Sequence, residues 1–302
     1  MLNKVAAVIV TYNRKMLLGE CLDALKRQSY PDLDVYVIDN GSTDGTLASI
    51  EPLLENPNYF YYNTGENLGG AGGFHFGIKT VVELGYDYIW IMDDDTIPQV
   101  SALDELLQAK MIVGENFGFL ASCVIWTNGD FCKMNNPGIM KEALYGQEYR
   151  FLENGIINIH HASFVSVLFR ADVIKEMGLP IKEFFIWKDD YEYTSRISTK
   201  YRGYYVSRSI VVHKMKNNSL PDIVWDDEER LGRYVFEFRN EYYLVRKQKK
   251  RLHFYYNTVG TIGRIIKSKT DHKWKRICII LNGVKQGWGF KPEIEFCVQE
   301  KN

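Results

Sequence analysis

Three consecutive aspartates follow directly on an apolar run in the stretch IWIMDDDTIP, residues 89–98. Side chains of an extended segment alternate between its two sides, so Asp93 and Asp95 would share one side and Asp94 would take the other. Carboxylate oxygens are the ligands that hard divalent cations such as Mg²⁺ and Mn²⁺ prefer. Asp93 and Asp95 therefore predict a divalent metal site. The alternative is an acidic loop that only caps the next segment.

A second acidic cluster lies in WKDDYEY, residues 187–193. If a helix begins here, Asp189 and Asp190 lie in its first turn, where the helix dipole stabilises negative charge. A carboxylate held near a desolvated site can also serve as a general base. His213 ends the apolar stretch SIVVH. A neutral imidazole can complete the coordination of a metal beside carboxylates, and a structural histidine is the alternative.

The glycine-rich stretch NLGGAGG, residues 67–73, lacks the GxGxxG spacing of dinucleotide-binding loops, and no GK[ST] follows it. What remains is a flexible backbone next to a helix N-terminus, which would let a ligand or an anion approach closely. A plain loop that leads into a helix is the alternative.

The elements that must position these groups alternate between apolar runs and helical patterns. Strands are predicted at residues 5–12, 34–40, 59–63 and 86–92, with helices at 14–28, 43–54, from about 70 to 84, and at 101–110. This order predicts an α/β fold with a mostly parallel sheet, in which ligands bind beyond the carboxyl ends of the strands. The polar motifs TYNR, DNGSTD and DDD all follow apolar runs at that end.

The second half of the chain is less regular. We expect strands at residues 117–126, 162–170 and 203–214, a helix within 183–198, and a long excursion over the site at 127–160. Aromatic and basic residues interleave at helical spacing from residue 225 onward. The sequence thus predicts a catalytic domain at residues 1–216 and a helical, basic and aromatic region at 217–302.

The net charge of −1 hides an asymmetry between the body and the C-terminal segment. Residues 241–302 carry 14 Lys and Arg against 5 Asp and Glu, whereas residues 1–240 carry 23 against 33. The basic and aromatic segment favours an anionic membrane surface as partner, and a solvated helix face is the alternative. Nucleic-acid binding is disfavoured, because the body contains no recognised reading module.

Cysteine spacing and hydropathy bear on the location of the chain. The five cysteines are scattered without CxxC spacing, which is typical of reduced cysteines and argues against a zinc site. The N-terminal apolar run is too short for a signal peptide, and no stretch reaches the 18 or more apolar residues of a membrane span. We expect a cytoplasmic protein that is at most peripheral at the inner face of the cell membrane.

Taken together, these motifs resemble those of the inverting family 2 glycosyltransferases with the GT-A fold. The resemblance covers residues 4–216, in family order, and rests on VIVTYNR (8–14), VIDNGSTDGT (37–46), NLGGAGGF (67–74), WIMDDDTIP (90–98), FFIWKDDYEY (184–193) and IVVHKM (210–215). It implies a GT-A sheet flanked by helices and a sugar-nucleotide donor whose diphosphate is held by Mn²⁺ or Mg²⁺ on Asp93 and Asp95.

The resemblance also implies roles for particular residues. Asp190 takes the position of the catalytic base, which deprotonates the acceptor hydroxyl in a single in-line displacement without a covalent intermediate. Acceptor binding is expected at Trp187, Asp189 and Glu192. The residues expected around the donor nucleotide are Thr11, Tyr12, Asn13, Arg14, Asp39, Asn67, Gly70, Asp93 and Asp94.

Within the family, the motifs look most like those of galactofuranosyltransferases, in which a histidine joins the two aspartates on the metal. That role transfers to His213, and the implied donor is UDP-galactofuranose. The implied acceptor is a glycan or a polyprenyl-diphosphate-linked glycan of a capsule or O-antigen. Lys188 departs from the closest pattern, and the chain is shorter than the polymerising enzymes. EFRNEYY (237–243) resembles a segment of rhamnosyltransferases, so dTDP-rhamnose is the alternative donor. A non-catalytic nucleotide-sugar-binding protein is a further alternative, and the oligomeric state stays open, a homo-oligomer included.

Overall fold

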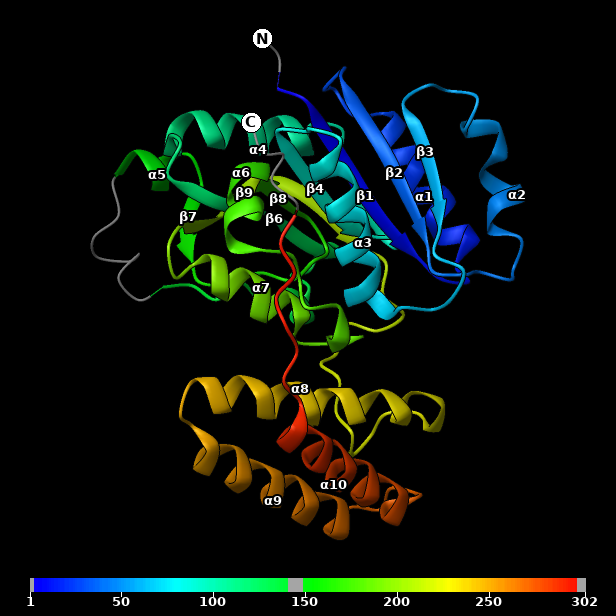
Figure 1. Ribbon diagram of the computed structural model, residues 1–302, viewed down its shortest axis with the longest axis vertical. Coiled ribbons are helices and arrows are strands. Elements are labelled where there is room, and N and C mark those ends of the chain that lie inside the picture. The colour runs from blue at the N-terminus through cyan, green and yellow to red at the C-terminus, as the bar shows by residue number, and fades with distance from the viewer. Residues whose placement is uncertain (1–2, 141–148, 298–302) are drawn as a thin grey trace.

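The computed structural model describes residues 3–140 and 149–297, and within them nine strands form one sheet (Figure 1). The strand order is β3-β2-β1-β4-β8-β6-β9-β5, and β7 pairs with β9 beside this path. The strands are β1 (Val5–Thr11), β2 (Leu33–Asp39), β3 (Tyr59–Asn63), β4 (Tyr88–Asp93), β5 (Thr96–Pro98), β6 (Phe117–Trp126), β7 (Ile156–Ile159), β8 (Val167–Arg170) and β9 (Arg202–His213).

The first four strands are parallel, as the alternation of apolar runs and helices predicts. Every residue of β1 is buried, and alternate residues belong to two different cores. Ala7 packs in the core that includes helices α1 (Lys15–Lys26) and α4 (Ala102–Val113). Val8 packs in the opposite core with α3 (Gly69–Glu83), α6 (Ala171–Met177) and α7 (Asp189–Ile197). The continuous apolar run thus reflects a strand covered on both faces.

Three antiparallel strands add to the mostly parallel sheet that the sequence predicts. β8 runs antiparallel to both β4 and β6, and it spans only the last part of the predicted strand at 162–170. β5 and β7 were not predicted, and both pair antiparallel with β9. β5 has only three residues, which is too few for a periodic pattern, and its Pro98 is tolerated because β5 is the edge of the sheet.

The predicted excursion at residues 127–160 contains short elements where the structure describes it. These are a 3₁₀ turn at Lys133–Asn135, helix α5 (Tyr149–Glu153) and β7, while residues 141–148 lie outside the described residues. The helix predicted at 43–54 divides into α2 (Thr46–Ile50) and a 3₁₀ turn at Glu51–Leu53, because Pro52 has no backbone N–H to continue the α-helical hydrogen bonds.

The glycines of the glycine-rich stretch, from Gly69 to Gly73, lie inside α3 and not in a loop ahead of it. Glycine is required here by packing, because a Cβ on Gly73 or Gly77 would lie 2.5 Å from a side-chain carbon of β1. The helix therefore sits close against the sheet. This corrects the expectation of a flexible backbone at these glycines, although Gly70 itself faces open space.

The C-terminal region is helical, as predicted, and forms a separate layer below the sheet domain (Figure 1). A 3₁₀ segment (Glu228–Arg233) leads into α8 (Tyr234–Lys247), α9 (Arg251–Lys267) and α10 (Lys273–Gly289), which share one apolar core. The chain then returns to the sheet domain, where Glu295 O accepts a hydrogen bond from Leu179 N. In the described ranges, 3–140 and 149–297, no helix has both the length and the apolar character needed to cross a membrane.

Candidate active site

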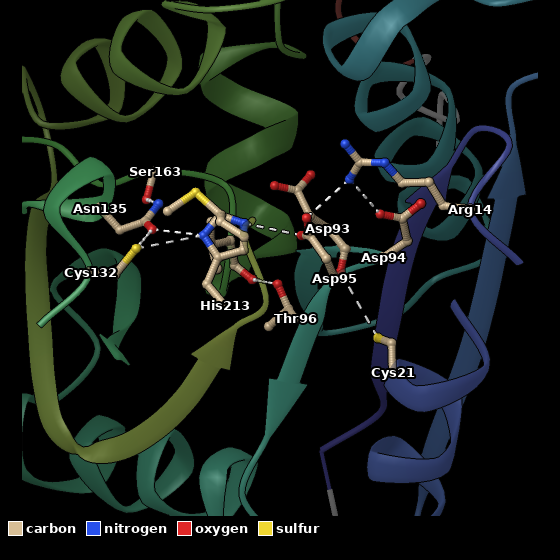
Figure 2. Close-up of polar contacts among 12 residues, drawn as sticks. Arg14, Cys21, Asp93, Asp94, Asp95, Thr96, Cys132, Asn135, Ser163 and His213 are labelled. Carbon is tan, nitrogen blue, oxygen red and sulfur yellow. Dashed lines mark hydrogen bonds and ion pairs between the residues drawn. The ribbon is translucent and has the colours of Figure 1, made fainter. Parts of the chain in front are cut away.

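The three aspartates lie at the carboxyl end of β4, where the sheet exposes polar groups of several strands (Figure 2). Thr11, the last residue of β1, donates a hydrogen bond from Oγ1 to Asp94 Oδ2 at 2.8 Å. Arg14 Nη1 lies 3.1 Å from Asp94 Oδ1 and 3.0 Å from Asp95 Oδ2. The parallel pairing of β1 with β4 brings these groups together, so Asp94, whose role the sequence leaves open, is held by Thr11 and Arg14.

His213 reaches the aspartates through the short strand β5. The register of β5 and β9 pairs Thr96 with His213, so the histidine lies opposite the residue that follows Asp95. One ligand atom from each of Asp93, Asp95 and His213 falls within 4.8 Å of the others. The structure thus brings together the three residues that the sequence predicts as metal ligands.

The donor atoms of this cluster fit a divalent cation. Asp95 Oδ1 is buried and has no aligned hydrogen bond from any described residue, although His213 Nε2 lies 3.1 Å away as an ion pair. Asp95 Oδ1 and His213 Nε2 thus face one another, and a divalent cation between them could bind both the carboxylate and the imidazole.

The outer side of His213 is fixed by residues that the sequence did not single out. Asn135 Nδ2 donates to Ser163 Oγ at 2.7 Å, which turns Asn135 Oδ1 toward His213 Nδ1 at 2.9 Å. Cys132 Sγ donates to the same oxygen. An Nδ1–H that donates to Asn135 leaves Nε2 as the ligand atom, which is the usual way in which a second residue orients a metal-binding histidine. No motif marks Asn135, because it lies 78 residues from His213 in the chain.

Burial, repulsion between carboxylates and the attraction of Asp95 to His213 together set the pKa values of the cluster. Burial, together with the charge of Asp95, raises the pKa of Asp93 to about 7. Burial also raises the pKa of Asp94 to about 6, although Arg14 opposes this effect. Burial opposes the charge on Asp95 as well, but the contact with His213 outweighs it and lowers the pKa of that carboxyl. In return, Asp95 raises the pKa of His213 to about 10 against the effect of burial. Metal ligands bind in their deprotonated forms, so a cation held here would require His213 to be neutral.

The second acidic cluster begins α7. Asp189 and Asp190 are its first two residues, and Asp190 Oδ1 accepts a hydrogen bond from Tyr191 N at 2.7 Å. Burial and the charge of Asp190 raise the pKa of Asp189, and the charge of Asp93 contributes to the same shift. The two acidic clusters therefore lie close enough for their charges to interact. Burial likewise raises the pKa of Asp190.

Two of the residues expected to bind the acceptor have partners within the protein. Glu192 is buried and forms an ion pair with Arg196, at 3.0 Å between Oε2 and Nη2. Trp187 packs on Tyr234 of α8, with ring centroids 4.9 Å apart. Their roles in acceptor binding stay predictions.

The residues expected around the nucleotide lie at the ends of the four parallel strands and in the segments that follow them. Asn13 links these loops, because its N–H donates to Ser42 Oγ and its Oδ1 accepts from Thr43 N. Asp39 is buried and accepts hydrogen bonds from Ser42 N and Tyr61 Oη. Tyr12 is exposed in the same loop, and Asn67 Oδ1 accepts from Gly69 N at the start of α3. Contacts of these residues with a nucleotide stay predictions.

Comparison with known proteins decides the family. Residues 6–178, more than half of the chain, match the family model described as Glycosyl transferase family 2. The chain belongs to glycosyl transferase family 2. This family membership confirms the resemblance seen in the sequence motifs, and it assigns the chain to the transferases.

Relatives and solved structures agree with this assignment. Galactofuranosyltransferase GlfT1 of Mycolicibacterium smegmatis is 28% identical over 207 residues, 64% of this chain and 65% of that protein, so the chain spans just under two thirds of the relative's length. The structure of TarS 1-349 of S. aureus in complex with UDP is 15% identical, with a TM-score of 0.55 over 92% of this chain and 71% of that one. The mannosyltransferase PcManGT of Pyrobaculum calidifontis, solved with GDP-Man and Mn²⁺, is 16% identical, with a TM-score of 0.53 over 96% of this chain and 74% of that one. These structures share the GT-A fold with this family 2 chain.

Proposed function

We propose that this chain is a metal-dependent, inverting glycosyltransferase that moves galactofuranose from UDP-galactofuranose to a glycan or a polyprenyl-diphosphate-linked acceptor of a bacterial capsule or O-antigen. The observation that carries the proposal is the convergence of one ligand atom each from Asp93, Asp95 and His213 within 4.8 Å. The similarity to GlfT1 supports the choice of donor sugar, and the UDP in the TarS complex supports a uridine nucleotide.

Each acidic cluster has a separate task in this proposal. Asp93, Asp95 and His213 would hold Mn²⁺ or Mg²⁺, which when bound neutralises charge on the donor diphosphate and on the departing nucleoside diphosphate. Arg14 and Thr11 keep Asp94 and Asp95 in a fixed orientation through the contacts described above. Because these contacts exist before any ligand binds, little reorganisation accompanies the reaction.

Asp190 acts as the general base. Its carboxylate takes the proton of the acceptor hydroxyl as the hydroxyl oxygen attacks the anomeric carbon from the face opposite the leaving nucleotide. The bond to the diphosphate breaks in the same displacement, so the anomeric configuration inverts. Burial strengthens the basicity of Asp190, because it raises the pKa of the carboxyl.

A screen of sugar nucleotides with Mn²⁺ tests the reaction and the donor together. We expect UDP-galactofuranose to release UDP and to glycosylate a lipid-linked acceptor, and proton NMR of the product to show the inverted anomer. Chelation by EDTA should abolish turnover, and added Mn²⁺ should restore it. Turnover only with dTDP-rhamnose would show that dTDP-rhamnose, and not UDP-galactofuranose, is the donor. Nucleotide binding without turnover of any donor would contradict the proposal that the chain is an enzyme.

We also propose that the C-terminal region docks on an anionic membrane surface, where a lipid-linked acceptor would reside. One stripe of α9 exposes Leu252, Tyr256, Val259 and Ile266, with Leu252 87% exposed. A stripe of α10 exposes Trp274, Leu281 and Trp288. The two stripes adjoin at one end, because Trp288 Nε1 donates to Tyr255 Oη of α9 at 3.2 Å.

The charge of this region matches an anionic bilayer, since residues 241–302 carry a net charge of +9. Exposed aromatic and aliphatic side chains flanked by cations are typical of helices that lie in the membrane interface. The proposal therefore places the chain at the inner face of the cell membrane as a peripheral protein.

Flotation with vesicles tests the docking. Wild-type protein should float with vesicles that contain phosphatidylglycerol and not with pure phosphatidylcholine. The triple variant L252S/W274S/W288S should lose binding, whereas Met111→Ser, which removes an equally exposed apolar side chain from α4, should not. Equal flotation of the triple variant would contradict the proposal. If wild-type protein does not float but forms a dimer, the exposed stripes would instead be the contact surface for a second copy of the chain.

A further inference from the structure

The segment that leads into α7 has an unusual backbone. Phe185, Trp187 and Lys188 have φ angles of 63°, 64° and 67°, in the left-handed region that side chains other than glycine rarely adopt. Each such residue costs about 1–3 kcal/mol, and the conformation persists only where the surrounding structure imposes it. The segment ends immediately before Asp189 and Asp190, so the direction of these acids depends on whatever holds residues 185–188.

The segment is held from outside the sheet domain by one side chain of α8. Asn240 is completely buried, and its Nδ2 lies 2.9, 3.1 and 2.9 Å from the carbonyl oxygens of Phe184, Ile186 and Trp187. A side-chain amide has only two N–H hydrogens, so one of them is shared between two carbonyls. The neighbouring Arg239 donates to the carbonyl oxygen of Phe184 as well. Asn240 thus satisfies three carbonyl groups of a strained backbone segment.

Side chains of the segment also find partners on α8. The ring of Phe185 stacks on Phe236 at 4.7 Å between centroids. Lys188 Nζ lies 3.2 Å from one carboxylate oxygen each of Glu237 and Glu241. Although burial opposes its charge, these two carboxylates raise the pKa of Lys188. The lysine that departs from the family pattern in the sequence is therefore an anchor to the C-terminal region.

The opposite side of the segment rests on the start of α3. Phe185 O accepts a hydrogen bond from Ala71 N at 3.1 Å. Gly69 leaves room for this carbonyl, because a Cβ there would lie 2.1 Å from Phe185 O. The segment is thus clamped between the glycine-rich helix of the sheet domain and α8 of the C-terminal region.

We propose that Asn240 is a positioning residue for the general base, and that the C-terminal region is for this reason part of the active site. The inference rests on the proposed role of Asp190. Asn240 acts through the backbone of residues 184–187 and touches no reacting atom. Loss of its hydrogen bonds would release the strained backbone and displace the acids, and displacement by about 1 Å can cost about 10²-fold in rate.

Kinetics of Asn240→Ala in the full chain test this role. We expect kcat to fall by about 10- to 100-fold, while KM for the donor and the affinity for Mn²⁺ stay near the wild-type values, because the metal site does not depend on the clamp. Ile265→Ala in α9 is the control for stability, since Ile265 is equally buried in the core of the C-terminal region. It should lower Tm without lowering kcat.

Hydrogen exchange supplies a second readout that needs no turnover. Asn240→Ala should accelerate amide exchange in a peptide covering residues 184–191 and leave residues 88–96 unchanged, and Ile265→Ala should accelerate neither. If wild-type protein turned over no donor, the proposed function would fail while exchange still decided whether the clamp exists. The inference is overturned if Asn240→Ala changes neither kcat nor exchange, or if Ile265→Ala reproduces both effects.

Discussion

The two acidic clusters of this family 2 glycosyltransferase differ in what holds them. Asp93, Asp94 and Asp95 lie at the end of a central strand. Their partners Thr11 and His213 end neighbouring strands of the same sheet, and Arg14 lies in the loop that follows β1. Strand pairing therefore brings the predicted metal ligands together. The pair at Asp189 and Asp190 instead follows a strained segment whose backbone is held largely by α8.

This difference shows that the two halves of the candidate active site are held by different parts of the protein, one by the sheet and the other by α8. The half with the predicted metal ligands is built on the ends of sheet strands, whereas the half that carries the proposed base depends on a region more than 40 residues further along the chain. Changes in the sheet cluster should affect metal and nucleotide binding, and changes around the clamp should affect kcat.

Within the sheet cluster, the largest effect is expected from Asp95→Asn. Loss of a ligand removes a Lewis acid that supplies several kcal/mol, and each 1.4 kcal/mol is tenfold, so kcat/KM should fall by about 10³-fold. Titration calorimetry should show weaker Mn²⁺ and UDP binding. Asp23→Asn on the exposed face of α1 removes the same charge as a control. Unchanged Mn²⁺ affinity in Asp95→Asn would show that the two halves are not divided as described.

Gly69→Ala should damage the other half. The added Cβ collides with Phe185 O, and Gly69 has a φ of 70°, so the free energy of unfolding should fall by about 2 kcal/mol and kcat should fall as well. Urea denaturation and steady-state kinetics measure both effects. Gly19→Ala, which meets no atom within 4 Å, should not destabilise the protein. If Gly69→Ala were stable and fully active, the close contact between the start of α3 and Phe185 would not be needed to hold the segment.

The pH dependence of kcat/KM separates the base from the metal site at saturating Mn²⁺. Burial and the charge of Glu237 raise the pKa of Asp190, while Lys188 lowers it. A raised pKa keeps the base protonated, and therefore inactive, up to a higher pH. As the pH is lowered, activity should therefore begin to fall at a pH above the ordinary aspartate pKa of about 3.9.

Lys188→Met should move that acid limb to still higher pH, because it removes the cation that favours ionised Asp190. A pH titration of kcat/KM from pH 4 to 9 measures the shift, and Lys214→Met, a lysine paired with Glu20 in α1, is the control. A limb that moves to lower pH in Lys188→Met would contradict the assignment of Asp190.

The smallest effect is expected where the C-terminal segment returns to the sheet domain. Glu295 contacts His75, Lys79 and Lys182, and the hydrogen bond from Lys79 is the main cause that lowers its pKa to about 2. Its contribution to stability is therefore present above the unfolded pKa near 4.3 and is lost as pH falls toward 2.

Glu295→Gln should lower Tm by about 1–3 °C at pH 7, and the difference should vanish near pH 2. Thermal melts followed by circular dichroism at both pH values measure it. Glu293→Gln, an exposed neighbour in the same segment, should leave Tm unchanged. A difference that persisted at pH 2 would point to packing in place of charge.

Much of the sheet domain could be predicted from the sequence, because buried parallel strands appear as continuous apolar runs and their carboxyl ends carry the polar motifs. Asp93, Asp95 and His213 were recognised from such strand ends, and the structure brings them together. β5 could not be predicted, although its pairing with β9 is what delivers His213. Three residues carry no periodicity, and the pairing joins positions far apart in the chain.

The support of the second acidic cluster was not predictable for a similar reason. Asn240 lies in a stretch that the sequence marked only by resemblance, and its bonds cross more than 50 residues. The left-handed backbone of Phe185, Trp187 and Lys188 has no sequence signal, because none of these residues favours it. Local propensity cannot report a conformation that a distant helix imposes.

The most direct test of the account is Asp190→Asn, which keeps the shape of the side chain and removes its ability to take a proton. We predict that kcat falls by about 10²- to 10⁴-fold while Mn²⁺-dependent UDP binding, measured by calorimetry, stays at the wild-type level. Wild-type turnover by Asp190→Asn, or loss of UDP binding together with turnover, would contradict the division of the active site into a metal-holding half and a base-holding half.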